Sequence, residues 1–251
     1  MLVKCFADCD ARDILAEFRR RGWLEDHGRD HRAARATQGR TTPKPKAKPP
    51  EEASNGGKAR WLWQRSRPIQ STIAEVYLRC ERGISCRLPA TLRFLPGNGR
   101  YPPSMIAAFG MPSEPEPSVL AIDGLNATAV HLTKLTADGC KHPDDPNKIM
   151  IGSAPGVPIV IAPMNDLLGL AVTEGLEDAL SVHQATGLGA WAAGSAGRMP
   201  ALARTVPDYA DCITIFADTD QAGESNSAQL AERLKLRGIH AEVLPLAEAL
   251  R

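Results

Sequence analysis

The sequence has few aromatic residues and no long apolar run, and both absences narrow the class of protein. Aromatic residues make up 5% of the 251 residues, against 43% for hydrophobic residues of all kinds. No apolar run approaches the roughly 20 residues that a membrane-spanning helix needs. Residues 1–5 lack the layout of a signal peptide. We therefore expect a cytoplasmic globular protein without a membrane partner, with one large domain or two ordinary ones.

Cysteines are scattered, which argues against a framework of disulfide bonds. Of the 6 cysteines, only Cys5 and Cys9 lie close together at a spacing that suits a metal ion. A loop of the Gly-x-x-x-x-Gly-Lys-Ser/Thr type is also absent, so the sequence offers no P-loop ATPase segment.

Charges of one sign are concentrated at each end of the chain, although the net charge is only +1. Lys and Arg outnumber Asp and Glu by 14 to 9 in residues 1–60 and by 10 to 8 in residues 61–160, whereas the ratio in residues 161–251 is 6 to 12. The three net charges are therefore +5, +2 and −6. A basic N-terminal region and an acidic C-terminal region fit a protein in which one part binds nucleic acid and another part binds a cation. Ordinary fluctuation of composition explains the charge distribution alone about as well.

Composition and hydrophobic pattern divide the chain into an N-terminal helical fragment, a basic Pro-rich linker, a mixed α+β lobe and a regular C-terminal domain. These segments are expected at residues 1–37, 38–57, 58–165 and 166–251. Within the α+β lobe, the pattern predicts a helix at 71–82, with Ile73, Val76 and Tyr77 on its apolar face and Cys80 as a further candidate, and a Pro-rich loop at 112–117.

Strands and helices alternate closely in the C-terminal domain, which predicts a parallel sheet with flanking helices. Strands are expected at 168–173, 188–193, 212–217 and 239–244. Helices are expected at 176–186, near 198–205 and at 222–237. Open parallel sheets bind ligands at the carboxyl ends of their strands.

Three acidic residues, Glu174, Asp218 and Asp220, follow directly after these expected strands. Residues i and i+2 of an extended chain point the same way, so Asp218 and Asp220 can face one site. Paired carboxylates suit Mg²⁺, which also accepts phosphate oxygens, although a bare Asp-x-Asp is more often a helix cap with a solvated acid. Asp178 lies one helical turn beyond Glu174 and is a further candidate ligand, whereas Glu177 is interpreted as favourable helix-start charge.

Glu174-Gly175, Gly194-Ser195 and residues 218–223, each after its own strand, resemble the Toprim domain that bacterial primases, topoisomerases and certain nucleases share. The resemblance implies that Glu174, Asp218 and Asp220 form a catalytic centre that depends on Mg²⁺, with Mn²⁺ as an alternative. It also implies the fold class, an α/β protein with a Toprim-type parallel sheet after a smaller α+β primase-core lobe.

Residues 77–84 resemble a signature of bacterial-type primases, and the phage- and plasmid-borne primase-like proteins match best. The resemblance covers about residues 58–245. It implies a nucleotidyltransferase of DNA replication that makes short primers from NTPs on a single-stranded DNA template, with a replicative helicase as a further partner.

Two departures from that family leave alternatives open. Cys5 and Cys9 resemble half of a zinc ribbon, so a Zn²⁺ site completed by His27 and His31 and a remnant with two free thiols both remain. The acidic motif that primases carry after the fourth strand is not found in residues 246–251. A Toprim nuclease and a non-catalytic DNA-binding fragment therefore stand beside the primase hypothesis.

Basic residues upstream of the Toprim-like region are candidates for binding nucleic acid or nucleotides. They are Arg79, Arg82, Arg87, Arg93 and Lys148 for the template, and Arg198 for a nucleotide phosphate. For any one arginine of this set, a solvated surface position is the more common role. Trp61 and Trp63 could stack on bases, although packing in a core or an interface is the more common role of tryptophan.

Overall fold

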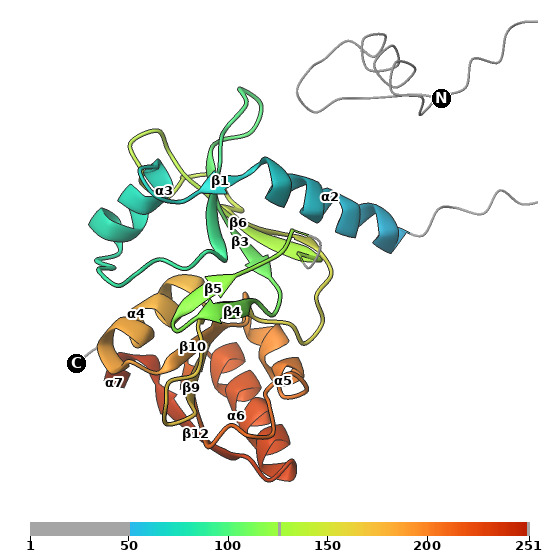
Figure 1. The fold of residues 1–251 in the computed structure, drawn as a ribbon, viewed down its shortest axis with the longest axis vertical. Helices are drawn as coiled ribbons and strands as arrows, with labels where there is room; N and C mark the ends of the chain where they lie inside the picture. The colour runs from blue at the N-terminus through green and yellow to red at the C-terminus, as the bar shows by residue number, and fades with distance from the viewer. Residues whose placement is uncertain (1–50, 125–126, 250–251) are drawn as a thin grey trace, which may run out of the picture. The chain divides into compact units, whose positions relative to one another are not determined.

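Two sheets of five strands each organise the part of the chain that the structure describes (Figure 1). This computed structural model describes residues 51–249 apart from 125 and 126. The expected zinc ligands Cys5 and Cys9, the fragment 1–37 and most of the linker 38–57 lie outside the described residues. No helix in the described range is long and apolar enough to cross a membrane.

The first sheet is antiparallel throughout and belongs to the α+β lobe. In spatial order, its strands are β1 (Arg67–Pro68), β2 (Leu92–Leu95), β3 (Ser104–Phe109), β6 (Ala129–Lys134) and β7 (Lys148–Gly152). Helix α2 (Glu51–Arg65) covers one face, where Trp63 is buried beside Ile106 and Val130. Side chains alternate between the two faces of a strand, so the neighbours of Ile106 along β3 point to the other face.

Helix α2 begins at Glu51 and therefore includes the last residues of the expected linker 38–57. Two glycines, Gly56 and Gly57, suggested a flexible segment there. Burial of Ala59 and Trp63 against the sheet explains the difference, because tertiary packing of a helix outweighs the low helix propensity of two glycines.

The helix expected at 71–82 is shorter and changes its winding. Helix α3 (Ile73–Val76) continues into a π-helical segment, η1 (Tyr77–Glu81), in which the Arg82 N–H donates to the Tyr77 carbonyl. The wider turn buries Tyr77 and Leu78, whereas Val76 is 42% exposed and Cys80 is exposed. The expected apolar face was wrong for Val76 and Cys80 because its period assumed a regular α-helix.

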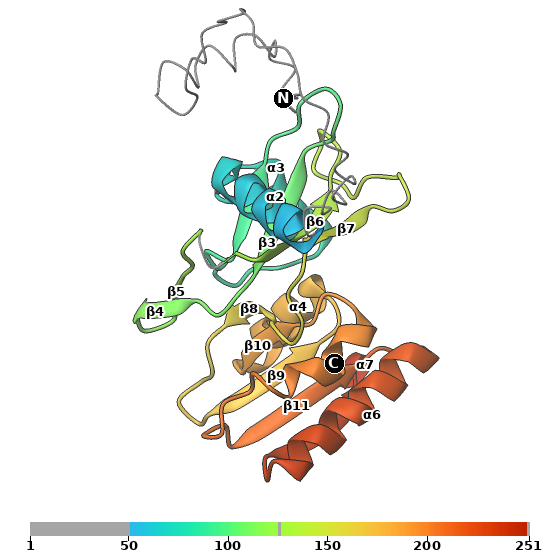
Figure 2. The same cartoon turned by 90° about the vertical axis from the view of Figure 1, so that its right-hand side faces the viewer.

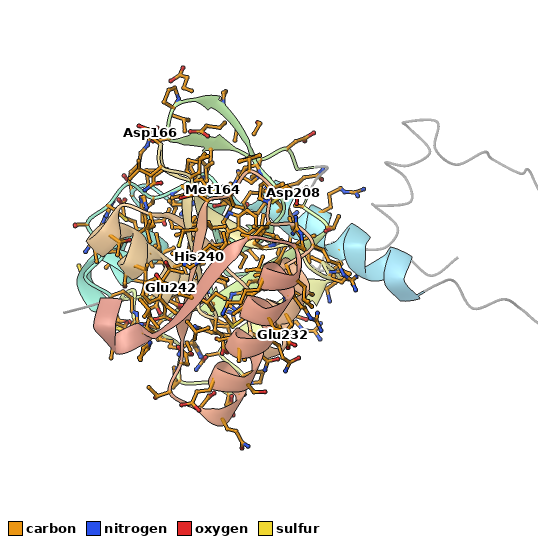
Figure 3. All side chains as sticks on the ribbon, turned by 90° about the horizontal axis from the view of Figure 1, so that it is seen from below. Met164, Asp166, Asp208, Glu232, His240 and Glu242 are labelled. Atoms are coloured by element: carbon orange, nitrogen blue, oxygen red, sulfur yellow. The ribbon has the colours of Figure 1, made fainter. Side chains whose placement is uncertain are left out.

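The second sheet is parallel in four strands and has one antiparallel edge strand, β8. In spatial order, its strands are β12 (His240–Pro245), β11 (Cys212–Ala217), β9 (Gly169–Thr173), β10 (Gly189–Ala192) and β8 (Ile159–Ala162). Its helices are α4 (Leu176–Thr186), η2 (Ala196–Arg198), α5 (Met199–Leu202), α6 (Gln221–Leu236) and α7 (Leu246–Ala249). Figure 3 shows β12, with His240 and Glu242, along the edge of the sheet beside α6.

The Pro-rich piece expected as a loop at 112–117 forms most of a small hairpin. Strands β4 (Ser113–Glu116) and β5 (Val119–Ala121) pair antiparallel around a turn in which Ser118 has a φ of 61°. The Glu114 carboxylate accepts the Ser118 N–H at 2.6 Å. Because every residue of β4 is exposed, the sequence had no apolar alternation from which this strand could be predicted.

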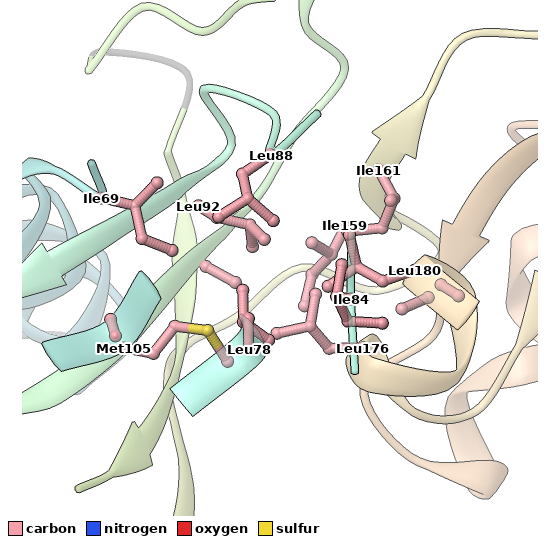
Figure 4. Close-up of a cluster of buried hydrophobic side chains, with 14 of the residues drawn as sticks. Ile69, Leu78, Ile84, Leu88, Leu92, Met105, Ile159, Ile161, Leu176 and Leu180 are labelled. Carbon is pink, nitrogen blue, oxygen red and sulfur yellow. The ribbon is translucent and has the colours of Figure 1, made fainter. Parts of the chain in front are cut away.

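One hydrophobic core joins the two lobes (Figure 4). Leu78, Leu92 and Met105 of the first lobe lie in the same buried cluster as Ile159 and Leu176 of the second. The described residues of both lobes accordingly belong to a single compact unit. The core fixes the N-terminal end of α4 against the first lobe, and this end carries the candidate site.

Candidate active site at the strand switch point

Glu174 and Asp218 lie at the point where the strand order of the second sheet reverses. From β9 the chain passes through α4 to β10 on one side, and it then returns to β11 on the other side of β9. Phe216 pairs with Thr173 in parallel register, so Glu174 and Asp218 emerge from neighbouring strands at the same edge. In open α/β sheets, such a switch point is where ligands bind.

Four carboxylates gather at this edge and repel one another. Burial raises the pKa of Glu174, and the charges of Asp218, Asp220 and Asp178 raise it further, although a hydrogen bond with the Ala196 backbone opposes this effect. Burial likewise raises the pKa of Asp178, with help from the charges of Glu177 and Asp218. The pKa of Asp218 is raised by burial and then by Asp220. The like-charge contributions to these pKa shifts show that the carboxylates lie close to one another, and a cation would relieve both their repulsion and the cost of burying them.

Asp220 has two roles that its position after β11 makes compatible. It is the N-cap of α6 and accepts the Gly223 N–H at 2.6 Å with one oxygen, Oδ1. The residue is exposed, so the rest of its carboxylate faces solvent beside Asp218. The helix cap that the sequence offered as an alternative to a metal ligand is therefore present, and it leaves the second oxygen available.

Two glycines pack closely against the acidic residues, but they differ in what surrounds them. A Cβ on Gly223 would lie 2.7 Å from the Asp218 carbonyl oxygen and 3.1 Å from the Asp218 Cβ. A Cβ on Gly175 would lie 2.0 Å from Oδ2 of Asp178, which is the movable end of a side chain. The backbone carrying Asp218 therefore depends on a glycine at position 223.

Gly223→Ala should destabilise the protein by about 1–2 kcal/mol, because the added methyl group displaces the Asp218 backbone at a greater cost than alanine gains in helix propensity. Urea denaturation followed by circular dichroism measures the difference. Gly175→Ala is the matched control and should cost less, since Asp178 can rotate away. Equal stability of Gly223→Ala and the natural protein would show that the backbone at Asp218 yields freely.

Arg198, which is expected to bind a nucleotide phosphate, ties the turn after β10 to neighbouring segments. Its guanidinium donates to the carbonyls of Ala193, Ala154 and Val157 and lies 4.5 Å above the ring centroid of Phe109. Burial lowers the pKa of Arg198. These contacts hold the turn that supplies the Ala196 hydrogen bond to Glu174.

Glu177 has a role that the sequence interpretation missed. Its side chain is 3% exposed, and it accepts hydrogen bonds from the Tyr77 hydroxyl at 3.0 Å and from Lys148 Nζ at 2.9 Å. Both donors belong to the first lobe. Burial opposes ionisation of Glu177, but Lys148 and the hydrogen bonds outweigh it and hold its pKa below the usual range. Glu177 does lie in the first turn of α4, as expected of helix-start charge, and the first lobe covers this turn, which the sequence did not indicate.

Lys148 and the buried His131 complete this polar cluster. The Lys148 charge opposes the rise in the pKa values of Asp178 and Asp218, so the ammonium group lies close enough to influence these carboxylates. Burial lowers the pKa of His131 to about 4, and its Nδ1 has no hydrogen-bond partner among the described residues. His131 is thus a packed, neutral side chain.

The other basic candidates divide into engaged and exposed side chains. Arg79 donates to the carbonyls of Ile84 and Cys86. Arg93 donates to the Ser66 carbonyl and lies 5.2 Å from the ring centroid of the buried Trp63. Arg82 and Arg87 are exposed, and the charge of Arg82 reaches Asp178. Of the template-binding residues predicted in the first lobe, Arg82 and Lys148 thus act on the acidic edge.

The carboxylates do not form a finished metal cage. Within residues 51–249 as described, no group of three or more His, Cys, Asp or Glu side chains is arranged to hold a metal ion. Mg²⁺ is commonly bound through one or two carboxylates, with water and substrate phosphates as its remaining ligands. The oxygen donors at the switch point fit that mode of binding.

Fold and site together define an α/β protein with a carboxylate cluster at the switch point of its sheet. Residues 169–249 match the family model of the Toprim domain, so this part of the chain is a Toprim domain, as the sequence predicted. Residues 53–161 match the family model of a domain of unknown function (DUF7146).

The chain is similar to the primase fragment of the bacteriophage T7 primase-helicase protein, with 16% sequence identity and a TM-score of 0.40. The similarity covers 67% of this chain and 60% of that one, so the chain spans about three fifths of that fragment. The search of curated proteins found no significant match to this chain.

Proposed function

We propose that this chain is a primase-like nucleotidyltransferase that makes short primers on single-stranded DNA by phosphoryl transfer. The observation that carries the proposal is the gathering of Glu174, Asp178, Asp218 and Asp220 at the switch point of a Toprim domain. The resemblance of residues 77–84 to a primase signature favours primer synthesis over the other Toprim reactions.

In this proposal Glu174, Asp218 and Asp220 hold Mg²⁺ or Mn²⁺, and Asp178 adds a further carboxylate. The bound ions would lower the pKa of the attacking 3′-hydroxyl and stabilise charge on the phosphate and the leaving pyrophosphate. The hydrogen bond from Ala196 keeps Glu174 oriented, and the cap to Gly223 keeps Asp220 oriented. Lys148 and Arg82 supply positive charge beside the carboxylates, where NTP phosphates would lie.

The partners of the proposed enzyme follow from this chemistry. Single-stranded DNA is the template, NTPs are the substrates, and a replicative helicase is a candidate partner. In this proposal residues 58–165 are the primase-core lobe and residues 166–251 are the Toprim domain. Extensive packing between the lobes supports a shared active site, because the core of Figure 4 keeps the first lobe against α4.

An assay with a labelled single-stranded oligonucleotide tests the proposal. The full chain is incubated with Mg²⁺, with and without NTPs, and the products are separated by length. NTP-dependent synthesis of new strands is the expected result. Shortening of the oligonucleotide without NTPs would identify a Toprim nuclease, and no change of either kind would identify a non-catalytic fragment. Either of these two outcomes would overturn the proposal.

A further inference from the structure

Arginines and exposed aromatic rings gather at one corner of the first lobe. Trp61 is 39% exposed and Tyr101 is 47% exposed. The Arg65 guanidinium lies 4.8 Å from the ring centroid of Trp61, and that of Arg100 lies 5.4 Å from the ring centroid of Tyr101. Each exposed ring thus has a cation beside it, which is an arrangement suited to bases and phosphates together.

Strand pairing explains why residues so far apart in sequence meet at this corner. Arg67 of β1 lies opposite Phe94 of β2 in antiparallel register. The end of α2 and the loop 96–103 therefore leave the sheet at the same end, and Figure 1 shows this loop in green above β1.

Hydrogen bonds within the loop 96–103 hold it in one conformation. The Tyr101 N–H donates to Oδ1 of Asn98 at 3.0 Å, and the Asn98 N–H donates to the Tyr101 carbonyl at 3.1 Å. At Gly97 an added Cβ would lie 2.8 Å from the Pro103 nitrogen, so the turn is tight. Arg100 and Tyr101 are presented by a preformed turn, which lowers the entropy cost of binding.

The segments that form this corner are basic in sequence. Residues 56–74 include Lys58, Arg60, Arg65 and Arg67 without any Asp or Glu, and residues 93–111 include two arginines without any Asp or Glu. No ion pair that the structure shows between described residues involves Arg65, Arg67 or Arg100. Acidic side chains such as Asp166, Glu232 and Glu242 belong to the other lobe (Figure 3).

We propose that the basic-aromatic corner, formed by Trp61, Arg65, Arg67, Arg100 and Tyr101, binds single-stranded nucleic acid. Phosphates would pair with the guanidinium groups, and unstacked bases would lie on the two rings. A single strand fits because the bases of a duplex are already stacked on one another. Helix α2 covers the sheet face that points away from the Toprim lobe, so this surface is separate from the acidic edge.

This inference rests on the proposed function, which supplies the reason for a single-stranded nucleic acid to be present. The binding itself needs neither metal nor catalysis. The full chain is titrated in EDTA against fluorescent 20-mers of oligo(dT) and oligo(rU) and a hairpin duplex, with anisotropy as the readout. Both single strands should bind more tightly than the duplex, and the ratio between them identifies the preferred sugar. Primer synthesis can then fail while this binding persists, and the binding can fail while primer synthesis persists, so the two proposals are tested separately.

Matched variants locate the binding surface. Arg65→Gln with Arg100→Gln should lower the slope of log affinity against log salt by about 1.4, because each lost phosphate contact removes about 0.7 for single strands. Arg204→Gln with Lys235→Gln removes the same charge from exposed sites of the other lobe and should leave the slope unchanged. Tyr101→Ala should weaken binding about tenfold, and Tyr101→Phe should restore it.

Three results would overturn the proposal. The first is an equal loss of affinity in the Arg65/Arg100 double variant and in the Arg204/Lys235 double variant. That result would show that only the net charge of the protein matters. The second is duplex binding as tight as single-strand binding. The third is competition by polyglutamate as effective as that by oligo(dT) at equal charge, which would mark the corner as a surface for an acidic protein.

Discussion

Asp218→Asn should abolish primer synthesis, with a loss of about 10³-fold or more, and should leave the folded protein slightly more stable at neutral pH. The loss of activity follows because an amide binds Mg²⁺ far more weakly than a carboxylate, and a factor of 10³ corresponds to about 4 kcal/mol of transition-state stabilisation. Removing a charge that is partly buried and repelled by Asp220 accounts for the gain in stability, which should raise the melting temperature by about 2 °C.

The pH dependence of that gain follows from the raised pKa of Asp218. A carboxyl group whose pKa is higher in the folded protein contributes stability below its unfolded pKa of about 3.9, and this contribution is lost as the pH rises through the folded value. The charge of Asp218 is therefore unfavourable at pH 7. The stability difference between Asp218→Asn and the natural protein should be present at pH 7 and should vanish near pH 4.

A control on the same strand separates the site from general charge effects. Asp211 is exposed and precedes β11, so it lies at the opposite end of the strand from Asp218. Asp211→Asn should keep full activity and the stabilisation by Mg²⁺, and it should lack the stability gain expected for Asp218→Asn. Calorimetry in Mg²⁺ and in EDTA adds a second readout, because Mg²⁺ should raise the melting temperature of the natural protein and not that of Asp218→Asn. Full activity of Asp218→Asn would refute the proposed mechanism.

Lys148→Met should destabilise the protein by about 2–4 kcal/mol, because it leaves the Glu177 carboxylate charged and buried without its cation. Breaking a fully buried pair costs about 3–5 kcal/mol, and the cost here is lower because the Lys148 side chain is 37% exposed. Urea denaturation at pH 7 measures the effect. Lys148→Met combined with Glu177→Gln should recover most of the loss, because the unpaired charge is then gone.

The pH dependence again gives a separate check. Because the pKa of Glu177 is held low in the folded protein, its charge stabilises the fold above the unfolded pKa of about 4.3, and this contribution is lost as the pH falls through the folded value. Without Lys148 the pKa should rise, so mild acid should reduce the damage in Lys148→Met. Tyr77→Phe removes one hydrogen bond to the same carboxylate and should cost about 1–2 kcal/mol. Unchanged stability of Lys148→Met would show that solvent, rather than Lys148, compensates Glu177.

Local patterns predicted the Toprim lobe more accurately than the first lobe. Helix α4 and strand β11 begin and end at the residues expected, since their apolar periodicity and flanking glycines or acids are local signals. In the first lobe, the buried strand β3 escaped prediction, because all six of its residues are buried and no alternation marks it. The π-helical winding of η1 likewise has no simple sequence period.

By itself the sequence determined the alternation of strands and helices in the Toprim lobe and the placement of Glu174, Asp218 and Asp220 after strands, because both depend on residues that are near one another in the chain. Only the tertiary structure decided which strands are neighbours, and therefore that the acidic residues share one edge. It also decided that Tyr77 meets Glu177 and that the end of α2 lies at the same end of the sheet as the loop 96–103. Such pairs form through packing between distant segments, and no local periodicity records that packing.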